Sequence, residues 1–287
     1  MDRQQLLQTF DALLQPVRFR DYGPNGLQVE GAAQVGKIVS GVTASRALIE
    51  AAIAAKADTI FVHHGLFWRG QDGRVTGWMK QRLALLLAHD INLFAYHLPL
   101  DAHPELGNNA QLARRLGLAA LRRFGDQDLG FLGEREGGAG FSDAGSLAEH
   151  VQSTLNHSVV LVNGASRAIK KIAWCTGGAQ GYFEAAIAAG ADAFLTGEIS
   201  EPQAHYARES GVAFIACGHH SSHRYGPPAV PAPGAAPFRL GAGFPRTPHT
   251  PGNATPPGCP AVLAAEPGSQ QGVELGSAQL TGLQPAD

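Results

Sequence analysis

The chain has 287 residues, of which 44% are hydrophobic and 16% are charged, and its formal net charge is −2. This length allows one large or two medium domains with a sizeable core. The nearly balanced charge excludes the basic character typical of nucleic-acid-binding proteins, so no nucleic-acid partner is expected. No segment approaches the ~20 apolar residues that a membrane-spanning helix needs, and no membrane association is expected either.

The three cysteines lie far apart in the sequence and form no CxxC pair or disulfide framework. Such cysteine usage favours a reducing compartment. The N-terminal segment, residues 1–7, lacks the basic and then apolar layout of a signal peptide. These features predict a soluble protein of the cytoplasm.

The first part of the chain predicts an α/β arrangement. Apolar residues at helical spacing indicate a helix over 2–14, which ends before Pro16. A strand at 37–42, an Ala-rich helix at 46–55 and a strand at 59–62 form a βαβ unit, which requires a parallel sheet. The other elements predicted for this first α/β half, residues 1–117, are a helix at 77–88, a strand at 91–96 and a helix at 108–116.

The segment 118–168 has a different character and is predicted to be a short linking or inserted segment. It alternates Gly-rich turns with short candidate strands at 129–132 and 159–162 and a helix near 146–155. A second α/β half, residues 169–226, then repeats the pattern of 37–101. Residues 37–64 align without gaps with residues 171–198, with ten identical positions, which indicates an internal duplication.

Histidines follow equivalent strands in both halves. In the first half, His63 and His64 directly follow the strand at 59–62, and His97 and Asp101 follow the strand at 91–96. In the second half, a strand at 212–217 precedes a cluster that contains His219, His220 and His223. Ligands bind at the carboxyl ends of strands in open α/β sheets. If the halves pack face to face, these strand ends converge on a central metal cleft.

The chemistry of this set predicts a transition-metal site. Imidazole and carboxylate donors suit zinc, manganese, iron, nickel or cobalt better than calcium or magnesium, which prefer oxygen ligands. Five or more candidate ligands exceed the needs of one tetrahedral ion, so the site holds either two ions or one ion with supporting partners. The implied reaction is metal-assisted hydrolysis, with no residue assigned as catalytic.

Several residues near these histidines could serve either the metal site or the structure. Glu198, which aligns with His64 in the repeat, is a candidate general base or neighbour of the metal, and His220 is either a supporting or a structural residue. Asn108 and Asn109 are expected to cap the following helix rather than bind substrate. The glycine cluster at 177–181 resembles a phosphate-binding turn but is too weak alone to predict a nucleotide site. The histidines expected to serve ordinary packing or to lie on the surface are His89, His103, His150, His157, His205 and His249.

Five segments in the same order resemble the GTP cyclohydrolase type 2 homolog family, also described as NGG-one-interacting-factor-three-like. The matching segments are GPNGLQVEG at 23–31, ADTIFVHHGLFW at 57–68, NLFAYHLPLDAHPELGNN at 92–109, ADAFLTGEISE at 191–201 and GHHSSHRYG at 218–226. The resemblance implies a duplicated α/β fold with a dinuclear metal centre between the halves, a toroidal homohexamer and a bacterial cytoplasmic location. It also implies that the ligands are His63, His64, Asp101 and His219, with His97 beside the metals.

Two features depart from that family's pattern. The family has a glutamate that bridges both metals at the position of His223, and a neutral imidazole offers only one lone pair to one metal. His223 is therefore a candidate ligand for one ion, and occupancy by two ions is put in doubt. The segment 227–287 has 13 of the 18 prolines and no lysine, and it replaces the expected last helix and strand. We interpret it as a disordered or frame-shifted tail, which leaves the second half incomplete.

Two hypotheses for the function follow. The first is a metal-dependent hydrolase that resembles GTP cyclohydrolase homologs and uses one or two divalent transition metals (Zn, Mn, Fe, Ni or Co) per subunit against a small, nucleotide-like substrate. The second is a non-catalytic metal-binding protein, with a regulatory or interaction role, that forms a ring-shaped oligomer. The same ligands serve both hypotheses, so the sequence leaves open whether the protein is an enzyme.

Overall fold

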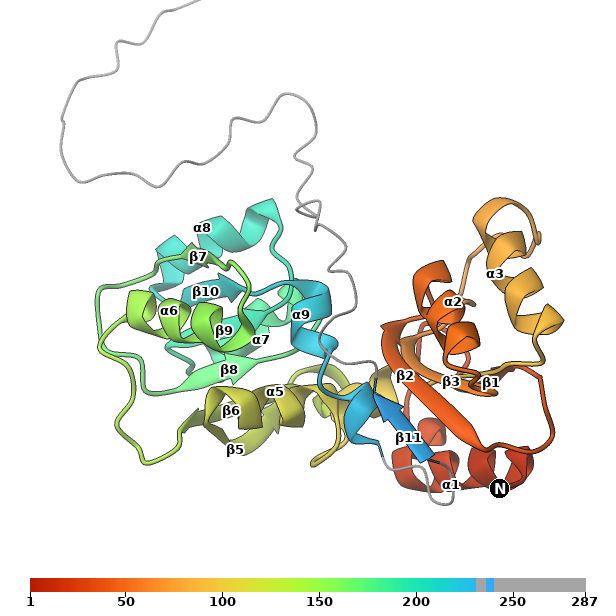
Figure 1. Ribbon diagram of the computed structural model, residues 1–287. Coiled ribbons are helices and arrows are strands. Elements are labelled where there is room, and N and C mark those ends of the chain that lie inside the picture. Colours follow the sequence, from red (N-terminus) through yellow and green to blue (C-terminus); the bar gives the residue numbers. More distant parts are fainter. Residues whose placement is uncertain (231–235, 240–287) are drawn as a thin grey trace, which may run out of the picture. The chain divides into compact units, whose positions relative to one another are not determined.

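The computed structural model describes residues 1–230 and, for the backbone, residues 236–239. These residues form two mixed β-sheets, each with helices on its faces (Figure 1). The α/β class with mixed sheets that the sequence predicts is confirmed. Within the described residues, no helix is long and apolar enough to cross a membrane.

The first sheet has five strands in the order β1-β4-β3-β2-β11. Strands β11, β2, β3 and β4 run parallel to one another, and β1 pairs with β4 in the antiparallel direction. The bounds are β1 (Gly26–Val29), β2 (Lys37–Thr43), β3 (Thr59–His64), β4 (Asn92–Ala95) and β11 (Ala236–Arg239). The predicted βαβ unit is therefore present, and β3 extends to include both histidines at its carboxyl end.

Helices cover both faces of this sheet, because the strands carry buried apolar side chains on both faces. On one face, Phe61 and Phe94 pack against Phe10 of helix α1 (Arg3–Leu14). On the other face, Ile60 and Val62 pack against α2 (Arg46–Ala54) and α3 (Gly77–Ala88). The side chain of Ser45 accepts a hydrogen bond from the amide of Leu48 and begins α2.

The second sheet has six strands in the order β5-β6-β8-β9-β10-β7. Strands β8, β9 and β10 are parallel, and the outer strands pair in the antiparallel direction. The bounds are β5 (Leu118–Phe124), β6 (Gly130–Arg135), β7 (Val160–Val162), β8 (Ile172–Trp174), β9 (Ala193–Thr196) and β10 (Ala213–Ala216). The segment 118–168 thus supplies three strands of this sheet.

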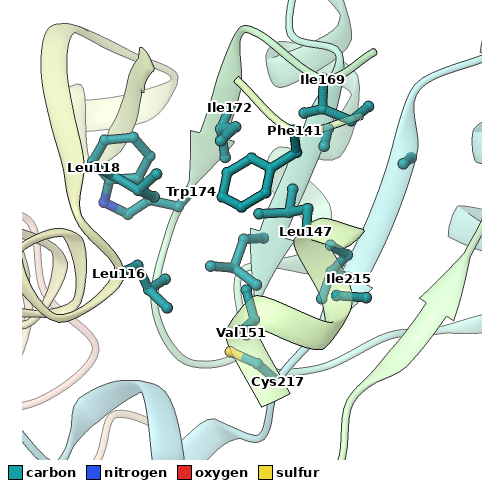
Figure 2. Close-up of a cluster of buried hydrophobic side chains, with 14 of the residues drawn as sticks. Leu116, Leu118, Phe141, Leu147, Val151, Ile169, Ile172, Trp174, Ile215 and Cys217 are labelled. Atoms are coloured by element: carbon teal, nitrogen blue, oxygen red, sulfur yellow. The ribbon is translucent and has the colours of Figure 1, made fainter. Parts of the chain in front are cut away.

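Two apolar clusters enclose the second sheet. Figure 2 shows one of them, in which Ile172, Trp174 and Ile215 of the strands lie against Leu147 and Val151 of α6. The other cluster joins the opposite face of the sheet to α7 and α8. The remaining helices are α4 (Leu98–Ala102), α5 (Asn108–Leu116), α6 (Ala144–Leu155), α7 (Phe183–Ala188), α8 (Glu201–Ser210), α9 (His219–His223) and the 3-10 helices η1 (Pro16–Arg18), η2 (Asp126–Asp128), η3 (Gln180–Tyr182) and η4 (Pro227–Ala229).

The two sheets share a common topology. In the first sheet, parallel strands β2, β3 and β4 follow an antiparallel strand, β1, that pairs with β4. In the second sheet, parallel strands β8, β9 and β10 follow β7, which pairs antiparallel with β10. The carboxyl ends of β3, β4 and β10 therefore occupy related places in the two sheets, and each carries polar residues.

The tail that we interpret as disordered or frame-shifted is described only in part. Residues 227–229 form η4, and Val230 packs against the cluster around Phe10. Residues 236–239 pair in parallel with β2 at the edge of the first sheet. Residues 231–235 and 240–287 lie outside the described part of the chain.

Candidate metal centre

Five histidines and one aspartate converge from three strand ends. His63 and His64 end β3, and His97 and Asp101 follow β4 at the start of and within α4. His219 and His223 lie on α9, which follows β10. Ring centroids are 4.2 Å apart for His63 and His223 and 5.0 Å apart for His64 and His219. The structure therefore brings together every metal ligand that the sequence predicts: His63, His64, Asp101, His219 and His223.

His63 is fully buried and has a defined orientation. Its Nδ1 lies 3.1 Å from the backbone carbonyl oxygen of Tyr96, so Nδ1 carries the proton and donates it. The Nε2 atom points into the cluster and has no hydrogen-bond partner among the described residues. A backbone carbonyl that fixes the tautomer of a ligand histidine is a common feature of metal sites. His63 thus presents one unshared lone pair to the centre of the cluster.

Asp101 lies opposite His63 and His223. Its Oδ1 atom is 3.6 Å from Nε2 of His63 and 3.5 Å from Nε2 of His223, distances too long for hydrogen bonds. The same oxygen accepts hydrogen bonds from Nδ2 of Asn108 at 2.7 Å and from Oγ1 of Thr176 at 3.2 Å. These two donors come from different halves of the chain and hold the carboxylate in place.

His64 and His219 meet across the two sheets, with their Nε2 atoms 3.3 Å apart. Nδ1 of His219 donates to Oε1 of Glu198 at 2.6 Å, which leaves a lone pair on its Nε2. Nδ1 of His64 lies 3.1 Å from the hydroxyl of Thr43. Glu198, a candidate general base in the sequence, therefore orients His219 in this structure.

His97 is held by a second carboxylate. Its Nδ1 donates to Oδ1 of Asp21 at 2.7 Å, and Asp21 also accepts from Asn25 and from the backbone amide of Leu98. Burial lowers the pKa of His97, but the hydrogen bond and the charges of Asp21 and Asp101 outweigh it, so its pKa is raised overall. The carboxylate of Asp21 thus orients the ring of His97 in the same way as the carboxylate of Glu198 orients the ring of His219.

His223 is 2% exposed, and neither of its ring nitrogens has a hydrogen-bond partner among the described residues. Gly177 leaves the room for its ring, since a Cβ atom at this glycine would lie 2.4 Å from Cε1 of His223. Buried polar atoms without partners are rare in folded proteins and call for an unseen ligand, water or ion. Through Gly177, the glycine cluster at 177–181 packs against the imidazole cluster.

The imidazoles of His63, His64 and His223 are neutral at physiological pH. Burial, assisted by the neighbouring imidazoles, lowers the pKa of His63 and of His223 well below the usual value of 6.5, and it lowers the pKa of His64 strongly. Burial raises the pKa of Asp101 to about 6, although the charge of His97 and two hydrogen bonds oppose the rise. Neutral imidazoles are the form that binds metals.

The family of this chain follows from its sequence as a whole. The family model for Duf34/NIF3 (NGG1p interacting factor 3) matches residues 1–232. The chain belongs to the Duf34/NIF3 family. The resemblance seen in the five sequence segments is thereby confirmed.

Relatives within the Duf34/NIF3 family cover most of the chain. A protein of Neisseria meningitidis serogroup B named "GTP cyclohydrolase 1 type 2 homolog" is 53% identical over 227 residues, which cover 79% of this chain and 90% of the relative. A protein of the same name from Pseudomonas aeruginosa is 51% identical and covers 78% of this chain and 89% of its own length.

Two solved structures are similar to this chain in fold and in sequence. The protein ybgI, described as of unknown function, has a TM-score of 0.78 and 40% sequence identity, covering 84% of this chain and 98% of its own. A protein of Thermus thermophilus has a TM-score of 0.72 and 33% identity, covering 80% of this chain and 91% of its own.

The residues of this family member fit a bound metal ion. Two groups of residues each have donor atoms that all lie within 4.8 Å of one another. The first group is His63, His64 and His223, and the second is His63, His97 and Asp101. Two nitrogens bound to one tetrahedral zinc lie about 3.3 Å apart, given zinc–nitrogen bonds near 2.0 Å. The distances of 3.3–3.6 Å that join His64 to His219 and Asp101 to His63 match this value. The neutral rings, the unpartnered nitrogens and the spacing therefore agree with a metal site.

Sequence reasoning missed the residues that support the ligands. The sequence assigned no role to Asp21 or to Thr176. Asn108 was expected to cap α5, but Gly107 is the N-cap and the Asn108 side chain binds Asp101. Asn109 likewise binds the backbone amide of Thr176. His220 is exposed at the surface of α9 and belongs to neither group of donors.

Aromatic side chains border the cluster on one side. The ring of Trp68 lies edge-on to His97 at 5.1 Å and near His64 at 6.0 Å. Tyr22, whose side chain is exposed, lies edge-on to His97 at 5.9 Å. A cavity of about 10 Å³, lined in part by His63, His97 and Trp68, has room for about one water molecule.

Proposed function

We propose that this member of the Duf34/NIF3 family is a metal-dependent hydrolase that acts on a small, nucleotide-like substrate. The observation that carries the proposal is the convergence of buried imidazoles and a buried carboxylate, in which Nε2 of His63 and both ring nitrogens of His223 have no hydrogen-bond partner within the described chain. The names of the relatives, "GTP cyclohydrolase 1 type 2 homolog", agree with hydrolysis of a nucleotide ring system.

Divalent transition metals, one or two per subunit, are the proposed cofactors. The residues that would hold them are His63, His64, Asp101, His219 and His223, with His97 beside them. A bound ion of this kind acts as a Lewis acid and makes water a better nucleophile at neutral pH. Asp21 and Glu198 accept hydrogen bonds from Nδ1 of His97 and of His219, which turns the Nε2 atoms of both rings toward the cluster.

The chain's own residues also support a substrate with a planar ring. The rings of Trp68 and Tyr22 lie next to the cluster, and stacking on an aromatic side chain contributes about 1–3 kcal/mol per base. The small cavity beside His63 and His97 has space for a water molecule, which is the second reactant in any hydrolysis. Glu198, with 46% of its side chain exposed, is open to solvent and available to exchange protons with it.

The proposed assembly is a homohexamer in the cytoplasm, as the family resemblance implies. Nothing in the proposed chemistry requires the assembly, because all named ligands come from one chain. Sedimentation of the full-length protein would test it, and a monomer would contradict it.

The function is tested by metal analysis followed by a hydrolysis screen. The full-length protein, purified without chelators, is expected to contain at least about 0.5 equivalents of a transition metal per subunit if one site is largely filled. It is then incubated with GTP, other nucleotides, pterin precursors and phosphoesters, and release of product is followed by chromatography. We expect turnover that His63→Gln abolishes and that His205→Gln, on the exposed face of α8, leaves unchanged. Bound metal without turnover on any of these substrates would contradict the hydrolase.

A further inference from the structure

We propose that His223 makes this centre mononuclear and rich in nitrogen, so that it binds one Zn²⁺, Co²⁺ or Ni²⁺ ion and discriminates against Mn²⁺ and Mg²⁺. This inference rests on the proposed metal-dependent function and specifies its cofactor. It concerns the number and class of ions and is independent of which substrate is hydrolysed.

The first argument is the placement of two histidines on one helix. His219 and His223 are four positions apart on α9, so their side chains lie on the same face. Their ring centroids are 4.9 Å apart. Two histidines at this spacing on a helix form a common arrangement for binding a single zinc ion. His223 forms a group of donors with His63 and His64, and His219 lies beside this group with its Nε2 atom 3.3 Å from Nε2 of His64.

The second argument is that the two groups of donors share one atom. Both groups contain His63, and its Nδ1 donates to the carbonyl of Tyr96, so only Nε2 is available. An imidazole nitrogen has a single lone pair and cannot bind two ions at once. An ion bound through His63, His64 and His223 therefore removes His63 from the other group. That group then keeps only His97 and Asp101.

The third argument is the scarcity of carboxylates that could bridge two ions. Asp101 is the one carboxylate in the two groups of donors among the described residues. The carboxylates of Glu198 and Asp21 bind the outer nitrogens of His219 and His97, away from the shared space. A carboxylate has two oxygens and can bridge two ions, whereas the neutral imidazole of His223 offers one lone pair to one ion.

The class of metal follows from the donors. Imidazole nitrogen suits zinc, nickel, copper and iron, whereas manganese and magnesium favour carboxylate and water oxygens. Four imidazoles and one carboxylate therefore favour a borderline ion. Gly177 supports this choice, because the absence of a side chain there admits the bulky ring of His223 into the cluster.

The experiment uses full-length protein from which metals have been removed with a chelator. Zn²⁺, Co²⁺ and Mn²⁺ are titrated separately at pH 7.5 by calorimetry, and the visible absorption of Co²⁺ reports its coordination. We expect one equivalent of Zn²⁺ or Co²⁺ per subunit, a four-coordinate Co²⁺ spectrum, and binding of Mn²⁺ weaker by about 100-fold or more. In His223→Glu we expect a second equivalent and at least about 10-fold tighter binding of Mn²⁺. His205→Glu, an equivalent change on exposed α8, should leave the number of bound equivalents and the affinity for Mn²⁺ as in the unmodified protein.

The outcomes separate this inference from the proposed function. Two equivalents of Zn²⁺ in the unmodified protein, or equal affinity for Mn²⁺ and Zn²⁺, would overturn the mononuclear, nitrogen-rich centre and leave the hydrolase proposal standing. If His223→Glu binds metals with the stoichiometry and affinity of the unmodified protein, the mononuclear, nitrogen-rich centre is likewise overturned and the hydrolase proposal stands. The stoichiometry of the unmodified protein decides the matter even if His223→Glu does not fold. No binding of any ion would overturn both proposals.

Discussion

The Nε2 atoms of His64 and His219 lie 3.3 Å apart, although 155 positions separate the two residues in the sequence. Each ring is fixed from behind, His64 by the hydroxyl of Thr43 and His219 by the carboxylate of Glu198. Since Nδ1 of His219 holds its proton toward Glu198, two lone pairs face each other unless a proton or a cation lies between them. This relationship between the two sheets is the basis for the first prediction.

Glu198→Ala should weaken metal binding by about 10-fold to 100-fold, because the carboxylate orients His219 and increases its basicity. Calorimetric titration with Zn²⁺ measures the effect. The matched control is Glu201→Ala, which removes a glutamate that pairs with His205 at 2.7 Å on the exposed helix α8. We expect the control to bind Zn²⁺ normally. Equal loss of affinity in both variants would contradict a specific role for Glu198.

Gly177→Ala should destabilise the protein more than Gly190→Ala. Both glycines have positive φ, 76° and 78°, so an alanine at either position costs about 1–2 kcal/mol of backbone strain. Only at Gly177 would the added Cβ also meet the ring of His223, at 2.4 Å, whereas the space around Gly190 is open. Urea denaturation measures the difference. We also expect Zn²⁺ affinity to fall only in Gly177→Ala, and retained affinity there would argue against His223 as a ligand.

The metal-free protein should lose stability as the pH falls from 7.5 to 5.5. The pKa values of His63, His64 and His223 lie well below 6.5 in the folded state, so the unfolded state takes up more protons below pH 6.5. Each histidine that stays neutral contributes about 1.4 kcal/mol to this loss over the interval.

Asp101 acts in the opposite direction. Its folded pKa of about 6 lies above the usual 3.8, so its protonation in the folded state recovers about 1 kcal/mol as the pH falls. For His63, His64, His223 and Asp101 together the net loss is then about 3 kcal/mol, measured by urea denaturation in the presence of EDTA. His223→Gln should reduce this loss by about 1.4 kcal/mol, somewhat less than half of it. A stability that does not change with pH would show that these histidines are not buried and neutral.

Trp68→Leu should weaken binding of a guanine nucleotide by about 10-fold while the affinity for Zn²⁺ stays unchanged, because the variant removes an aromatic stacking surface. Equilibrium dialysis of the zinc-loaded protein with GTP measures this effect. Trp78→Leu is the matched control, since Trp78 lies on α3 with 54% exposure and takes no part in the cluster. Equal nucleotide binding by the unmodified protein and Trp68→Leu would exclude Trp68 as a substrate-binding residue.

The sequence by itself determined the local elements and the kinds of residue at the strand ends. The apolar runs at 37–42 and 59–62 with an Ala-rich helix between them predicted β2, α2 and β3, because periodicity is a local property. The duplication then indicated that His63 and His219 follow strands of two related units. Strand β5 was not predicted, because its middle residues are exposed and its sequence shows little apolar alternation.

Only the tertiary structure decided which polar groups meet. Asp21 binds His97 from 76 positions away, and Thr176 binds Asp101 from 75 positions away. Asn108 had the position of a helix cap in the sequence but donates to Asp101 in the structure. A polar side chain bonds to whichever partner the packing of distant elements places within reach, and neither hydrophobic periodicity nor motif spacing contains that information.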